Sequence, residues 1–364
     1  MLTFDFSSGQ GSALPEFVST KGDDVRHALS VKEGWRRFVN EKAVKPKPVT
    51  RSQLDQMNPA RRAEYQAARQ RFHRSLVIAR HPQLDTCWGQ MQSIVQGQVY
   101  DDGPGMGVAL SGGPGFGKTA VTVGFAREYE RALAAQFPDA FNQTNEFIPV
   151  CYSSLLRGAG LKAQMHHILR FYGHPVSLRA TGADLVDELI LVMNTCKTHL
   201  LCLDQAQNLH VGDKRDDQVA ACLKDIMDGA HCTLILTGID IHETGPLAVA
   251  TGGRRQTSND RLQLARRFTV NRIQPLARGS QEWTDLLTTI ENQLVLCDTK
   301  PGDLSHAMSD SIWDRSQGAI GVAFNLLRVA ANTAINDGSE RITRTLLRKV
   351  SPTIEHATLK RKVA

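Results

Sequence analysis

A glycine-rich motif in the first third of the chain most constrains its fold. Residues 111–119 read Ser-Gly-Gly-Pro-Gly-Phe-Gly-Lys-Thr, and their spacing fits the P-loop pattern G-x-x-x-x-G-K-[ST]. A short, mostly apolar run (107–110) precedes the motif, and a helix-compatible run (120–133) follows it. The order of strand, loop and helix separates a P-loop from a chance glycine-rich turn. The motif therefore predicts binding of a nucleoside triphosphate.

Each residue type in the motif has a chemical reason. Glycines let consecutive backbone N–H groups turn inward around phosphate oxygens, and the following helix adds the positive end of its dipole. Lys118 reaches the β- and γ-phosphates, and the Thr119 hydroxyl ligates Mg²⁺. We therefore expect ATP and Mg²⁺ as cofactors, with contacts from Gly112, Gly113, Pro114, Gly115, Phe116, Gly117, Lys118, Thr119 and Ala120.

Composition sets wider limits on the chain. Its 364 residues suffice for two or three structural units, and 41% hydrophobic and 22% charged residues are ordinary for a globular protein. No run of 18 apolar residues and no charged-then-apolar leader is visible, so we expect no membrane partner and a cytoplasmic location. Seven scattered cysteines without a C-x-x-C pair favour reduced thiols over disulfides or zinc ligands.

The charge balance is basic, with a formal net charge of +6. Lysine and arginine are concentrated at residues 32–80, 254–278 and 341–362. Such a balance is compatible with a nucleic-acid partner, although solvated basic surfaces are common.

The N-terminal part, residues 1–58, is expected to form an arm that is partly disordered or partner-binding. Within it, helical spacing of apolar residues predicts a helix near 31–40, and prolines favour an extended stretch over 42–50. A helix predicted from 59 to 80 carries a basic face that would either lie along DNA or be solvated: Arg61, Arg62, Arg69, Arg71 and Arg74.

Strand and helix patterns then alternate, which predicts an α/β fold with a parallel sheet and helices on both faces. Strands are expected at 108–111, 146–152, 199–203, 232–236 and 268–273. Beyond residue 275 the pattern is helical only, near 281–296, 305–316, 320–337 and 342–349. We therefore divide the chain into an ATPase core with N-terminal helices (59–275), a small helical lid (276–350) and a basic tail (351–364).

The apolar run before Asp204 is a candidate Walker B strand. A buried strand delivers its carboxylate to the edge of the sheet where ligands bind, so Asp204 joins Thr119 as a predicted Mg²⁺ residue. The next residue is Gln205, where such ATPases usually carry the glutamate that polarises water. An amide orients water but accepts no proton, so ATP turnover should be slow or absent. Two alternatives stay open: another group positions the water, or the glutamine was introduced to trap the bound state.

Two further features belong to the predicted catalytic group. Thr237 ends the fourth strand and suits a sensor of the γ-phosphate and attacking water, or is a simple strand-end threonine. Arg266 and Arg267 precede the fifth strand, where an arginine of a ring or filament ATPase reaches the neighbouring subunit's site. Surface arginine pairs are also common, and we place Arg267 slightly ahead of Arg266.

These features together resemble one family. The P-loop, the string Asp204-Gln205-Ala206-Gln207-Asn208-Leu209, the Thr237-Gly238 turn and the segment from Arg266 to Leu276 are similar to the AAA+ ATPases of transposition, the TnsC/TniB group. That group has D-E-A-Q-x-L at the second motif, so only the glutamate differs. The resemblance covers roughly residues 80–350. Many AAA+ lids place an arginine sensor near the glycines that are Gly318 and Gly321 here, so that sensor is expected to be missing.

The resemblance implies an ATP-dependent regulator that assembles into rings or helical filaments on double-stranded DNA. It implies recruitment and activation of a transposase at the target site, with input from a target-selection protein or an RNA-guided complex. Family members contact the DNA backbone after the second strand, which here selects Arg157, Lys162, Arg179 and Thr181. Such contacts are salt-sensitive and carry little sequence preference, and solvated surface positions are equally compatible.

Two other hypotheses remain open from the sequence. One is a helicase-loader-like ATPase of DNA replication, which shares the same nucleotide-binding motifs. The other is a signalling P-loop ATPase that switches protein interactions. That reading requires an effector domain, and none is visible in residues 1–100.

Overall fold

The computed structural model describes residues 28–42, 44–75, 81–98, 103–142, 146–209, 214–243, 245–248 and 259–350. Residues 1–27 of the predicted arm (1–58) and the basic tail (351–364) lie outside these residues. The chain forms two compact units. The first unit comprises Met1–Glu41, Trp88–Ser111 and Thr122–Arg272, and the second comprises Lys42–Cys87, Gly112–Val121 and Ile273–Ala364.

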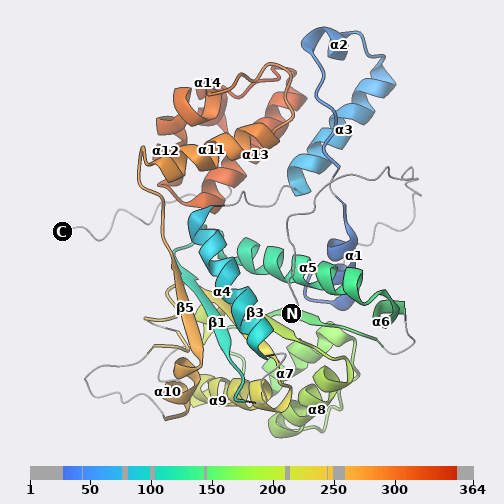
Figure 1. The fold of residues 1–364 in the computed structure, drawn as a ribbon, viewed down its shortest axis with the longest axis vertical. Helices are drawn as coiled ribbons and strands as arrows, with labels where there is room; N and C mark the ends of the chain where they lie inside the picture. Colours follow the sequence, from blue (N-terminus) through green and yellow to red (C-terminus); the bar gives the residue numbers. More distant parts are fainter. Residues whose placement is uncertain are drawn as a thin grey trace, which may run out of the picture. The chain divides into compact units, whose positions relative to one another are not determined.

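A five-stranded parallel sheet with surrounding helices dominates the first unit, which confirms the predicted α/β fold (Figure 1). The strand order is β2-β3-β4-β1-β5. Direct pairing is parallel between β2 and β3, between β3 and β4, and between β1 and β4. The strands are β1 (Gly107–Gly112), β2 (Val150–Ser154), β3 (Leu200–Asp204), β4 (Thr233–Gly238) and β5 (Phe268–Ile273).

The central strands are mostly apolar because both of their faces are covered. All residues of β3 and β4 are buried, and their sequences LLCLD and TLILTG show no alternation with polar residues. All five strands lie close to their predicted positions, but β2 begins later than expected. Pro149 precedes it and has no N–H to donate, so the ladder starts at Val150.

The helices of the first unit include those expected near 31–40 and over 120–133. The helices are α1 (Lys32–Asn40), α5 (Lys118–Gln136, whose first turn belongs to the second unit), α6 (Pro138–Asn142), α7 (Leu161–Leu169), α8 (Gly182–Thr195), α9 (Lys214–Gly229) and α10 (Asn259–Arg266).

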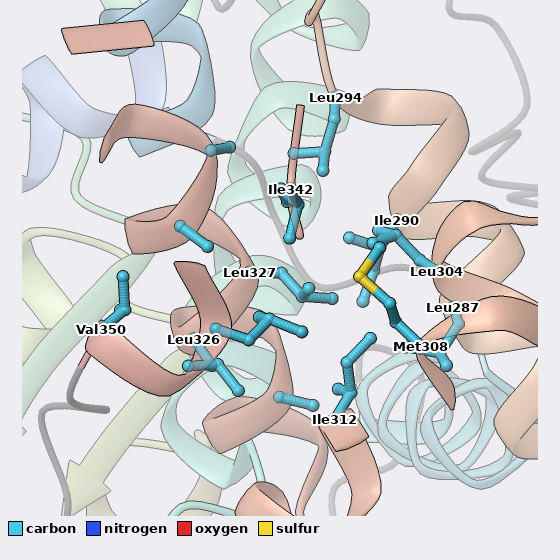
Figure 2. Close-up of a cluster of buried hydrophobic side chains, with 14 of the residues drawn as sticks. Leu287, Ile290, Leu294, Leu304, Met308, Ile312, Leu326, Leu327, Ile342 and Val350 are labelled. Carbon is cyan, nitrogen blue, oxygen red and sulfur yellow. The ribbon is translucent and has the colours of Figure 1, made fainter. Parts of the chain in front are cut away.

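The second unit is helical around one apolar core. Figure 2 shows leucines, isoleucines and Met308 of the predicted lid packed together, among them Leu287, Ile290, Leu326 and Leu327. Its elements are α2 (Arg51–Asp55), α3 (Pro59–Ser75), α11 (Gln281–Gln293), a π-helix (Asp303–Ala307), α12 (Ser309–Ser316), α13 (Ile320–Asn336) and α14 (Arg344–Lys349). Helix α4 (Pro82–Gln98) passes from the second unit into the first.

Helix α3 belongs to the same unit as the lid, so the unit boundaries differ from the predicted domain boundary at residue 59. The Arg69 guanidinium and the Glu340 carboxylate are fully buried and form a two-pronged pair, with distances of 2.5 and 2.9 Å. The prediction of a DNA-facing or solvated side chain is therefore wrong for Arg69. Arg69 holds α3 on the lid, whereas Arg61, Arg71 and Arg74 of the same helix are exposed.

Within the described ranges, no single helix is long and apolar enough to cross a membrane. The pair α12 and α13 passes that length and composition test together, but the two helices are bent by 119°. Their apolar residues, including Ile312, Leu326 and Leu327, are buried in the lid core.

Candidate functional site

The shape of the P-loop is set by its backbone, and the side chain of Lys118 lies over it. Gly115 and Gly117 have φ values of 74° and 90°, in the left-handed region that glycine adopts at no steric cost. A Cβ on Gly112 would lie 2.3 Å from the Ile273 carbonyl oxygen. The Lys118 ammonium donates to the carbonyls of Gly112 (2.9 Å) and Gly113 (2.7 Å). The positive charge of Lys118 therefore lies against the backbone of the loop.

The start of lid helix α13 packs directly on this loop. A Cβ on Gly321 would lie 2.6 Å from the Gly115 carbonyl oxygen and 3.3 Å from the Gly117 nitrogen. Gly318, with φ of 73°, approaches Leu276 just as closely, and its carbonyl accepts the Leu276 N–H at 2.9 Å. A side chain at either position would meet the opposing backbone, because the two backbones approach where a Cβ would begin.

Asp204 ends β3 and is 6% exposed. Its Oδ1 accepts the N–H of Gln205 at 2.7 Å, and its Oδ2 accepts the hydroxyl of Tyr152 at 3.1 Å. Burial, and then the neighbouring Asp204 charge, raise the pKa of Tyr152 far above its usual range, so the phenol remains a donor. Mg²⁺ prefers oxygen ligands, so a carboxylate oriented in this way suits the predicted role of Asp204 toward a hydrated cation.

Gln205 is exposed, and its backbone lies in the left-handed region (φ 60°, ψ 34°), which is uncommon for a residue with a side chain. Its side-chain oxygen accepts from the Gln207 amide at 2.5 Å, and the Gln207 oxygen accepts the Ile239 N–H at 3.1 Å. Gln207 therefore ties the loop after β3 to the turn after β4. Sequence reasoning gave it no role, although it stands in the family-like string after Asp204.

Thr237 is fully buried, and its hydroxyl lies 2.7 Å from that of Thr122 on α5. Ser111 connects the end of β1 to the segment after β4, because its hydroxyl lies 2.7 Å from Nδ1 of His242. The sequence did not single out Thr122, because only the fold brings it to β4. The sensor role of Thr237 stays a prediction and requires that its hydroxyl exchange this partner.

The two candidate arginines lie in different environments. Arg267 forms an ion pair with Asp228. Partial burial opposes ionisation of Asp228, but this pair and the N–H of Gly105 hold its pKa below the usual range. Arg266 is exposed at the end of α10, and no hydrogen bond or ion pair within the described ranges engages it. The geometry thus favours Arg266 over Arg267 for a contact with another subunit.

The predicted DNA-contact residues gather around the starts of α7 and α8. Arg157 and Arg179 are exposed on loops, and Lys162 on α7 donates to the Leu178 carbonyl at 2.9 Å. Thr181 has a structural task, since its hydroxyl accepts the Asp184 N–H and caps α8. The structure therefore brings Lys162 close to the Leu178–Arg179 loop.

No group of three or more metal-ligating side chains of histidine, cysteine or acidic type occurs among the described residues. The seven cysteines, all within the described part of the chain, are free thiols. Burial raises the pKa of Cys87 to about 11 and that of Cys232 to about 12, so these thiols are poor nucleophiles.

Comparison with known proteins gives the family and the fold. The family model described as "Bacterial TniB protein" matches residues 69–276, more than half of the chain. A search of curated proteins finds no match. Among solved structures, ORC1 of Aeropyrum pernix in complex with DNA is similar at 14% identity and a TM-score of 0.52, covering 73% of this chain. The chain spans 63% of that structure's length.

Two other solved structures give similar values. ORC2 of Aeropyrum pernix in its ADP form matches at 17% identity and a TM-score of 0.51, covering 72% of this chain and 66% of its own. CDC6P of Pyrobaculum aerophilum matches at 18% identity and a TM-score of 0.51, covering 77% and 70%. At this identity the likeness concerns the fold alone. With the P-loop and the parallel sheet in place, these findings show that the chain is an AAA+ protein of the bacterial TniB family.

Proposed function

We propose that this protein is an ATP-dependent, DNA-binding AAA+ regulator that oligomerises on duplex DNA and recruits and activates a transposase at the target site. The observation that carries the proposal is the P-loop, in which Lys118 lies on the loop carbonyls and Gly321 of the lid packs on the loop backbone. Membership of the TniB family supports the same conclusion.

Nucleotide binding follows from the donors in the P-loop. The Lys118 ammonium already lies 2.7 to 2.9 Å from two carbonyl oxygens, and it would exchange them for phosphate oxygens, which carry more charge. Thr119 and Asp204 would hold Mg²⁺, which neutralises phosphate charge. Because α13 begins against the P-loop, a nucleotide bound to the loop would directly affect the position of the lid.

Turnover is proposed to be slow. The Gln205 amide accepts no proton, and its oxygen is bonded to Gln207. Bound ATP would therefore persist and act as an assembly signal. An exposed Arg266 would stabilise the phosphates of a neighbouring subunit, so that the nucleotide lies in the contact between copies.

DNA contact is assigned to the exposed cations near the starts of α7 and α8. Arg157, Lys162 and Arg179 carry no structural ion pair in the described part of the chain, so they are available to backbone phosphates. Thr181 is the weakest of the four predicted contacts, because its hydroxyl caps α8 and its own N–H donates to the Asp184 carboxylate. A transposase and a target-selection protein or RNA-guided complex would then bind the assembled form.

Light scattering of the full chain with duplex DNA tests the proposal. We expect ATP to produce particles much larger than the monomer and Lys118→Ala to abolish them. The exposed Lys349, at the far end of the lid, provides a charge-matched control when replaced by alanine. Stable monomers of the wild-type chain in DNA and ATP would contradict the proposal.

A further inference from the structure

Helix α1 is joined to the first unit by polar contacts at both of its ends. The side chains of Lys32 and Arg36 pair with Glu146 at 2.8 and 3.2 Å. Arg131 donates to the carbonyls of Val39 and Glu41, both at 2.7 Å. These contacts fix the helix on the first unit and set the position of the tryptophan in its middle.

That tryptophan, Trp35, is 1% exposed and has two specific neighbours. Its indole N–H donates to the buried Glu130 carboxyl at 2.7 Å. Its ring stacks on the Tyr152 ring, with centroids 5.9 Å apart and an interplanar angle of 16°. The tyrosine ring is thereby covered on one face by a residue of α1.

Tyr152 connects this ring stack to the end of β3. It lies in the middle of β2, paired in register with Cys202, and its hydroxyl reaches Oδ2 of Asp204 two residues further along β3. The other oxygen of Asp204 accepts the N–H of the next residue. Both carboxylate oxygens are thus oriented, one by the local backbone and one by a side chain whose position depends on Trp35.

We propose that Tyr152 is a positioning residue for Asp204 and that Trp35 of α1 holds Tyr152 in place, so that α1 is part of the Mg²⁺-nucleotide site. The inference rests on the proposed binding of Mg²⁺-ATP at Asp204. Without the Tyr152 hydroxyl, the Asp204 carboxylate loses a donor that fixes its plane. The carboxylate is then less well oriented to bind the hydrated cation. Without the Trp35 ring, the same phenol loses the surface that fixes its ring.

The test is a titration of a fluorescent ATP analogue bound to the full chain, with Mg²⁺ varied and with a parallel series in EDTA. Tyr152→Phe keeps the ring and removes only the hydroxyl. We expect its affinity for the nucleotide in EDTA to match the wild type. We expect its Mg²⁺ midpoint to rise about tenfold or more, the size of one hydrogen bond to a charged group.

Tyr172→Phe is the matched control. Tyr172 is a buried tyrosine of the same unit whose hydroxyl lies 3.0 Å from that of Thr198, so the variant also loses one buried hydroxyl contact. It should lower the melting temperature by a similar amount and leave the Mg²⁺ midpoint unchanged. A change of the midpoint in both variants would indicate general loosening and overturn the inference.

A double-mutant cycle tests the role of Trp35. Trp35→Ala should raise the Mg²⁺ midpoint in the same direction as Tyr152→Phe, and the double variant should not exceed the larger single effect, because both changes act through one contact. Trp35→Phe, which keeps a ring, should recover most of the wild-type value. Trp35→Leu, which keeps an apolar side chain but no ring, replaces the alanine variant in the cycle if that variant does not fold.

The outcomes separate this inference from the proposed function. A wild-type chain that binds no ATP overturns the proposed function and the inference together. Wild-type binding that responds to Mg²⁺, with an unchanged midpoint in Tyr152→Phe, overturns the inference alone. Additive effects in the Trp35 and Tyr152 cycle would remove Trp35 from the site and leave Tyr152.

Discussion

Each unit buries one glutamate where a helix of the N-terminal region docks, and the two carboxyl groups differ in their partners. In the second unit, Glu340 receives the guanidinium of Arg69 from α3. In the first unit, Glu130 receives the indole N–H of Trp35 from α1. A guanidinium brings a full opposing charge, whereas an indole brings one neutral donor.

The difference appears in the two pKa values. Burial opposes ionisation of Glu340, yet the hydrogen bonds and charge of Arg69 hold its pKa below the usual range. Burial raises the pKa of Glu130 to about 7, because the Trp35 bond and the distant Arg36 charge offset only part of it. The contact that holds α3 therefore keeps its charge pair, whereas the contact that holds α1 depends on pH between about 4.5 and 7.

The largest effect is expected from breaking the clamp. Arg69→Ala leaves the Glu340 charge buried without its partner and should destabilise the second unit by about 3–5 kcal/mol. Urea unfolding of the full chain measures this loss. Arg71→Ala, which removes an exposed arginine of the same helix, is the control and should change little. Equal effects of the two substitutions would show that the buried pair is not the anchor.

The next effect concerns Glu130 and has a defined sign. Its pKa rises from an ordinary 4.5 to about 7 on folding, so its stabilising contribution is complete below about 4.5 and is lost as pH rises toward 7. Relative to Glu130→Gln, the free energy of unfolding of the wild type should fall by about 3 kcal/mol between pH 4.5 and 7. This follows from about 1.4 kcal/mol per pKa unit. Glutamine retains an acceptor for the indole. Parallel pH profiles for both proteins would contradict the assignment.

The smallest effect is expected at the exposed pairs that also hold α1. Glu146→Gln removes the partner of Lys32 and Arg36, which are themselves partly exposed, and should cost at most about 1 kcal/mol, with less effect in high salt. Denaturation at low and high ionic strength measures it. A loss above about 3 kcal/mol, the size of the pH effect expected at Glu130, would reverse the order of the two contacts.

Sequence patterns predicted the sheet, the P-loop and the lid because each depends on residues that are close in the chain. The glycines of the P-loop and the apolar runs of β3 and β4 are local signals. The contacts that hold α1 and α3 and that orient Asp204 join distant residues. Trp35 and Glu130 are 95 positions apart, Tyr152 and Asp204 are 52 apart, and Arg69 and Glu340 are 271 apart.

The prediction for Arg69 was wrong because it rested on a local sequence pattern. Its helix is rich in arginine, so the sequence favoured a DNA-facing or solvated side chain, and only the fold supplies a buried carboxylate opposite it. Gln207 illustrates the opposite case. It was visible in a recognised string, but its role as a link between two strand ends depends on Ile239, which follows a different strand.

We propose that this chain holds ATP rather than consuming it, since the residue after Asp204 is an amide. The direct measurement is the single-turnover rate of ATP cleavage on duplex DNA for the wild type and for Gln205→Glu. We predict tight binding with little cleavage in the wild type, and a gain of roughly a hundredfold when the carboxylate is restored. A wild-type rate that Gln205→Glu leaves unchanged would contradict the account and place water activation on another group.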